Sequence, residues 1–150
     1  MTEMWLVRHG ESVANVAATA AERAGIELIT VDQRDADVPL SPTGREQARA
    51  FGEWLATNGS GNDPTSVWVS SYDRARETMS IALVEAGIER AVRIDDRLRD
   101  RELTNASVTR LVRAASSGPW RLADLAAEEH LEASDVPITE HQGEEDVEVR

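Results

Sequence analysis

The sequence contains no cysteine and no long hydrophobic run. The absence of cysteine excludes disulfides and thiolate metal sites. No apolar stretch approaches the roughly 18 residues that a transmembrane helix needs. The first residues also show neither the basic region nor the apolar core of a secretory signal. We therefore expect a cytoplasmic protein that does not interact with membranes.

Positive charge is also scarce, because the formal net charge is −12 at pH 7. Nucleic-acid affinity depends on basic surface that neutralises phosphates, so no nucleic-acid partner is expected. Much of the acidic charge lies near the end of the chain. We expect one domain over residues 1–131 and an acidic, loose tail over 132–150. Arginines stand instead in segments that follow predicted strands, where they could hold a small anion.

Short apolar runs alternate with helix-prone segments along most of the chain. Strands are predicted at residues 4–8, 66–70, 91–94 and 105–112, with a return strand at 120–122. Helices are predicted at 12–24, from a start at 41–43, and at 73–86. This order predicts an α/β fold with a mostly parallel sheet flanked by helices.

The tetrapeptide Arg8-His9-Gly10-Glu11 stands at the end of the first predicted strand. Open α/β sheets bind ligands outside the carboxyl ends of their strands. Arg8 offers a fork of donors for a phosphate, and Gly10 allows the backbone a close approach. His9 can act as a nucleophile or as a proton carrier. The alternative is an ordinary turn with a solvated histidine and arginine, and the tetrapeptide alone does not decide between the two.

Two further charged segments follow predicted strands. Arg74 lies near the start of a helix, where free amides and the helix dipole attract anions. The alternative is that Arg74 and Arg76 are solvated and pair with Asp73 and Glu77. Residues 96–103 alternate acid and base, which is typical of a surface ion-pair ladder. The same segment could instead deliver a carboxylic acid that protonates a leaving oxygen.

Together these segments resemble the histidine phosphatase superfamily, the phosphoglycerate-mutase-like proteins. The resemblance covers residues 4–103 through four motifs in the family's order, at 6–12, 40–48, 70–78 and 98–103. It implies the family's α/β sandwich, and it implies that Asn15 borders a phosphate pocket.

The resemblance also implies a role for each remaining site residue. His9 would take the phosphoryl group as a phosphohistidine, while Arg8 and Arg74 would hold the phosphate oxygens. Asp100 falls where the family places its acidic proton donor, with Glu102 as a less suitable substitute. No metal or cofactor is needed for this chemistry. The expected partner is a small phosphorylated substrate or inorganic phosphate.

The sequence departs from the family at its second histidine. The later histidines are His130 and His141, and neither follows an apolar strand. Residues 105–131 resemble the last hairpin and the end of full-length members. The simplest interpretation is that an internal segment carrying the second histidine is absent, with the junction near Thr104. The strand predicted at 105–112 could then move into the vacated position of the sheet.

Three hypotheses follow for the function. The first is a phosphatase that acts through phosphohistidine and is weakened, because the loss of one transition-state donor typically costs about 100–1000-fold in rate. The second is a phosphate-binding pseudo-phosphatase without turnover, and the third is an unstable product of a deletion. A mutase is less favoured, because it must shield its phosphoryl group from water in a closed pocket.

Overall fold

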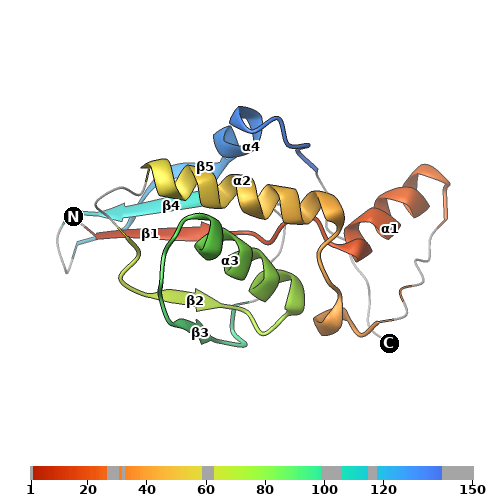
Figure 1. Cartoon of the computed structure of the whole chain (residues 1–150), viewed down its shortest axis with the longest axis horizontal. Coiled ribbons are helices and arrows are strands. Elements are labelled where there is room, and N and C mark those ends of the chain that lie inside the picture. Colours follow the sequence, from red (N-terminus) through yellow and green to blue (C-terminus); the bar gives the residue numbers. More distant parts are fainter. Residues whose placement is uncertain are drawn as a thin grey trace.

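The strands of the protein form two separate sheets in this computed structural model (Figure 1). The structure describes residues 2–26, 31, 33–58, 63–98, 106–114 and 118–139. The larger sheet has the order β1 (Thr2–Val7), β4 (Val108–Arg113) and β5 (Arg121–Ala127). The smaller sheet pairs β2 (Val67–Val69) with β3 (Val92–Ile94).

The prediction of a mostly parallel sheet is wrong for the described strands. β1 pairs antiparallel with β4, and β4 pairs antiparallel with β5. Only β2 and β3 are parallel. They are joined through α3 (Asp73–Glu85), which supplies the crossover that a parallel pair requires. β4 and β5 are separated by residues 114–120 in the sequence, fewer than a parallel crossover requires, so these strands run in opposite directions. The α/β class itself is confirmed.

β1 and β2 belong to different sheets and share no hydrogen-bond ladder among the described strands. Figure 1 shows their arrows pointing the same way, with β4 on the side of β1 that faces away from β2. The strand that could fill the place of an absent segment is β4, and it pairs with the edge of β1 that faces away from β2. It does not stand between β1 and β2.

Two helices cover the sheets and create the core. α2 (Pro42–Asn58) and α3 lie side by side in front of them (Figure 1). Phe51 of α2, Ala82 of α3 and Val108 of β4 form a buried cluster, against which Trp5 of β1 packs. A Cβ on Gly52 would lie 2.6 Å from the Ala82 carbonyl oxygen, so this glycine lets the two helices pack closely.

Local signals predicted the helix starts. α1 (Val13–Arg23) begins after Ser12, whose hydroxyl accepts from the Asn15 amide in a capping box. The Ser41 hydroxyl accepts from the Gly44 amide at the start of α2, so Ser41 caps this helix. Within the described residues, no helix has the length and apolarity to cross a membrane.

The last helix, α4 (Glu129–Ala133), was not predicted, and the chain after it packs back onto the fold. Val136 contacts the buried cluster that contains Leu131. The Gln47 side-chain amide donates to the Pro137 carbonyl at 2.7 Å. The first part of the segment predicted to be a loose tail is therefore in contact with α2. Residues 140–150 lie outside the described part of the chain.

Candidate active site

His9 lies directly after β1 with 7% of its surface exposed. Its Nδ1 is 2.7 Å from the Gly10 carbonyl oxygen, and the Arg74 Nε lies 3.1 Å from its Nε2. Both contacts are hydrogen bonds only if Nδ1 carries the proton and Nε2 accepts. The arrangement therefore presents the Nε2 lone pair toward an arginine.

Arg74 is buried in the first turn of α3, immediately after the strand that was predicted to deliver it. Its Nη1 donates to the Asp35 carbonyl at 2.7 Å and to the Asp35 carboxylate at 2.9 Å. Its guanidinium carbon lies 4.7 Å from the centre of the Tyr72 ring. The solvated alternative is thus wrong for Arg74. It holds for Arg76, which forms an exposed pair with Asp73 at 3.4 Å.

Replacing Asp35 by asparagine is expected to tighten the binding of inorganic phosphate severalfold. Asp35 belongs to a short helical turn, η1 (Asp35–Asp37), and its carboxylate would compete with a phosphate bound at the Arg74 guanidinium. The substitution removes that charge and leaves the backbone carbonyl contact in place. Isothermal titration calorimetry with phosphate measures the effect.

The matched control is Asp37→Asn in the same turn, because Asp37 pairs with the exposed Arg34 instead. It removes one negative charge without freeing Arg74, so it should change phosphate affinity much less. Equal changes in the two variants would mean that only the overall charge matters, and the proposed competition would be wrong.

Hydrogen bonds from two helices fix the loop that carries His9. The Gly10 amide donates to the Thr78 hydroxyl at 3.0 Å, and this hydroxyl donates to the Arg74 carbonyl at 2.7 Å. The Glu11 amide donates to the Gln47 side-chain oxygen at 2.8 Å. Sequence reasoning gave Thr78 and Gln47 no role. Both are polar residues within the motif segments, at 70–78 and 40–48. Their position in these segments is the signal that could have pointed to them.

The loop also approaches the start of α2 at van der Waals distance. A Cβ on Gly10 would lie 2.4 Å from the Gly44 carbonyl oxygen, and a Cβ on Gly44 would lie 2.0 Å from the Glu11 carbonyl oxygen. The prediction that Gly10 permits a close backbone approach is confirmed. Gly44 has the same property, which the sequence did not reveal.

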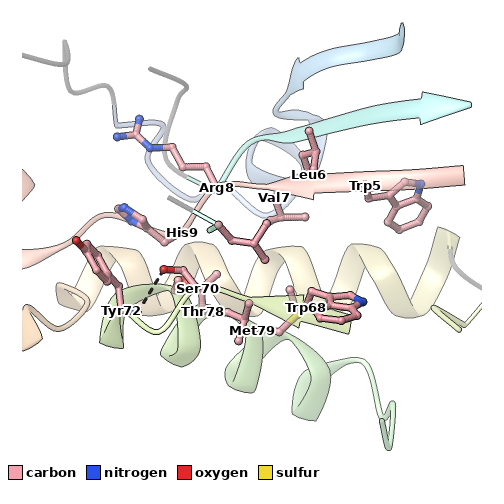
Figure 2. Close-up of a pocket in the computed structure, with 13 residues that line it drawn as sticks. Trp5, Leu6, Val7, Arg8, His9, Trp68, Ser70, Tyr72, Thr78 and Met79 are labelled. Carbon is pink, nitrogen blue, oxygen red and sulfur yellow. Dashed lines mark hydrogen bonds between the residues drawn. The ribbon is translucent and has the colours of Figure 1, made fainter. Parts of the chain in front are cut away.

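The other predicted site residues are less closely grouped. Arg8 is buried, but its side chain and that of His9 leave the end of β1 in different directions (Figure 2). The Asn15 side-chain oxygen accepts from the Ser12 amide at 2.9 Å, so this side chain caps α1. The phosphate contacts expected of Arg8 and Asn15 remain predictions. Asp100, Glu102 and His141 lie outside the described residues.

His130 is linked to the His9 backbone through Ala106. Its Nε2 is hydrogen-bonded to the Ala106 carbonyl at 3.0 Å, and the Ala106 amide donates to the His9 carbonyl at 2.9 Å. The imidazole is 2% exposed and packs against Phe51 and Trp54. Burial lowers the pKa of His130, which favours the neutral ring. His130 is therefore a core residue.

A cavity of about 330 Å³ extends from His9 between the two sheets. Figure 2 shows His9 and Tyr72 at one end of it and the two tryptophans, Trp5 and Trp68, at the other. Its walls come from β1, from β2 and from the inner face of α3. In the part of the chain that the structure describes, no three histidine, aspartate or glutamate side chains gather as a metal site would require.

A protein-family model matches most of the chain. The model described as the histidine phosphatase superfamily (branch 1) matches residues 4–132. A curated relative, the 2,3-bisphosphoglycerate-dependent phosphoglycerate mutase of Thermobifida fusca (strain YX), is 38% identical over 102 residues. That match covers 65% of this chain and 36% of the relative, so the chain spans about a third of the mutase.

Solved structures share the fold at low sequence identity. A protein of Agrobacterium tumefaciens described as the phosphohistidine phosphatase SixA has a TM-score of 0.61 at 14% identity. A mycobacterial glucosyl-3-phosphoglycerate phosphatase has a TM-score of 0.64 at 17% identity. Both matches cover 85% of this chain, with 99% of the first structure and 100% of the second.

Proposed function

The chain belongs to the histidine phosphatase superfamily, and on that basis we propose that it hydrolyses a small phosphomonoester through a phosphohistidine at His9. One observation carries the proposal. The Nε2 of a buried histidine at the carboxyl end of a strand accepts a hydrogen bond from a buried arginine at 3.1 Å. This pairing places a nucleophilic lone pair beside a cation that can neutralise a phosphate.

The reaction has two steps. In the first, the His9 Nε2 attacks phosphorus, the bond to the ester oxygen breaks, and the leaving oxygen takes a proton. In the second, water attacks the phosphohistidine, the phosphorus–nitrogen bond breaks, and inorganic phosphate leaves. The Nδ1–H bond to the Gly10 carbonyl orients the ring and stabilises the positive charge that develops on it.

The remaining roles follow the family resemblance. Arg74 would exchange its bond to His9 for one to a phosphate oxygen, and Arg8 would hold a second oxygen. Asn15 would border the same oxygens. The proton for the leaving group would come from Asp100. Catalysis then rests on positioning and charge neutralisation.

A phosphate-binding protein without turnover is the second candidate function, and two observations favour it. Asp35 already occupies Nη1 of Arg74. Within the described residues, the only histidine besides His9 is His130, which is buried in the core. The pocket would then bind phosphate without the second histidine that assists transfer in the family.

Hydrolysis of 4-nitrophenyl phosphate in the presence of EDTA tests the first function. We expect release of nitrophenol and an acid-labile, alkali-stable phosphoenzyme after rapid quenching. Phosphate binding by a cooperatively folded protein that shows neither nitrophenol release nor phosphoenzyme would favour the second function.

A further inference from the structure

The cavity beside His9 is polar at one end and apolar along the rest. The polar lining residues lie toward the end that holds His9 (Figure 2), and they are Arg8, His9, Ser70, Tyr72 and Thr78. From there the cavity runs between β1 and β2, and its walls are apolar side chains, among them Trp5, Trp68 and Met79 (Figure 2). A ligand that matches both ends has an anionic head and an apolar body.

Three apolar side chains of this wall are incompletely buried. Leu6 is 45% exposed, Trp68 is 47% exposed and Leu98 is 41% exposed. Exposed apolar surface that is continuous with a polar site is typical of a ligand-binding groove. Covering it with an apolar group removes that surface from water, which favours binding.

The space suits a small ring system. A volume of about 330 Å³ lies in the range of small-molecule sites. β1 and β2 belong to different sheets, and no described strand pairs with both of them. The space between them therefore holds none of the strands that the structure describes. α3 closes the inner side through Ala75 and Met79.

The same walls disfavour an alcohol with many hydroxyl groups. Apart from the polar residues Arg8, His9, Ser70, Tyr72 and Thr78, the lining consists of tryptophan, leucine, valine, alanine and methionine side chains. A sugar or a glycerate placed there would lose its hydrogen bonds to water without replacement by side chains, which costs binding free energy. The phosphoglycerates in the names of two of the relatives are therefore poor candidates for this chain.

We infer that the cavity between β1 and β2 binds the alcohol part of the substrate, and that this alcohol is an apolar group the size of one or two rings. The inference rests on the proposed function for the position of the phosphate at His9 and Arg74. The substrate class is then a phosphomonoester of an aromatic or similarly apolar alcohol.

Binding of two phosphonates to the full chain tests the inference without turnover, because a carbon–phosphorus bond is not hydrolysed. The probes are 2-naphthylmethylphosphonate and methylphosphonate, which share the anionic head and differ in the ring. We expect the naphthyl compound to bind at least about tenfold more tightly, since the cavity buries its apolar surface. Isothermal titration calorimetry gives both dissociation constants.

Two variants test whether the naphthyl ring binds in the cavity. Ala75→Phe fills it from α3, and Trp68→Ala removes an exposed part of its wall. Each should weaken the naphthyl compound, by at least about tenfold and severalfold respectively, and should leave methylphosphonate binding unchanged. Trp120→Ala is the matched control, since Trp120 is an exposed tryptophan just before β5, outside the lining of this cavity. If Ala75→Phe does not fold, Trp68→Ala still gives the answer.

Equal affinity for the two phosphonates, or no binding of either, would overturn the inference and leave the space to an extended peptide between the strand edges. The proposed function fails separately. Tight naphthyl binding without hydrolysis of 4-nitrophenyl phosphate would support the apolar subsite and reject the phosphatase. Equal kcat/KM for 2-naphthyl phosphate and glycerol phosphate would support the phosphatase and reject the subsite.

Discussion

His9→Ala is expected to lower the rate of 4-nitrophenyl phosphate hydrolysis by at least about a thousandfold, to the rate without protein. The variant lacks the nitrogen that forms the covalent intermediate, and residues that act as a unit with a nucleophile contribute little once it is removed. No phosphoenzyme should be trapped by rapid quenching. Steady-state kinetics and acid-labile phosphate measure the two effects.

His9→Ala should lose its turnover because the nucleophile is absent and not because the protein unfolds. The His9 ring bonds to its neighbouring carbonyl and to Arg74, while the loop backbone is held independently through the Gly10 and Glu11 amides. The variant should therefore melt cooperatively near the temperature of the unmodified protein. Added imidazole should restore part of the turnover by filling the vacated space. Turnover that survives in His9→Ala would show that the nucleophile is another group.

Gly44→Ala is expected to destabilise the fold by at least about 3 kcal/mol, in the range of severe overpacking. The new methyl group would lie 2.0 Å from the Glu11 carbonyl oxygen, which is backbone and cannot rotate away. The Glu11 position is fixed because its carbonyl accepts from the Ser41 amide and its own amide bonds Gln47. Urea denaturation monitored by tryptophan fluorescence measures the loss.

Gly87→Ala is the control for this substitution. Gly87 has a φ of 67°, and a Cβ added there would meet no atom within 4 Å. Alanine at this position therefore costs only backbone strain, about 1–2 kcal/mol. Gly44→Ala should also lose phosphate binding, whereas Gly87→Ala should retain it. Similar urea midpoints for the two variants would contradict the close approach of the His9 loop to α2.

Local sequence signals predicted most elements because each rests on nearby residues. The capping serines at positions 12 and 41 set the starts of two helices, and Gly25 and Gly87 follow the ends of α1 and α3 with positive φ. The placement of His9 and Arg74 at strand ends was predictable for the same reason. Each follows a short apolar run, and both runs end at the same side of the fold.

Long-range pairing was not predictable in the same way. Nothing in the β4 sequence specifies that it pairs antiparallel with β1, since an apolar run suits either direction. The contact between Asp35 and Arg74 joins residues 39 apart, and Asp35 gave no signal beyond its charge. His130 stands in a polar, acidic stretch, so its burial beneath Ala106 depends on the fold that surrounds it.

The division into two sheets has a mechanical consequence. His9 is carried at the end of the larger sheet, whereas Arg74 is carried by the helix that follows the first strand of the smaller one. A continuous ladder would resist shear between them, but here the two sheets are joined through the close packing of α2 and α3 at Gly52 and through the hydrogen bond from the Gly10 amide to the Thr78 hydroxyl of α3. The spacing of the two side chains that would share one phosphate therefore depends on side-chain contacts with α3 and on helix packing, and no strand ladder described in the structure sets it. A substitution at the interface between α2 and α3, remote from the ligand, would therefore change the distance between the His9 and Arg74 side chains.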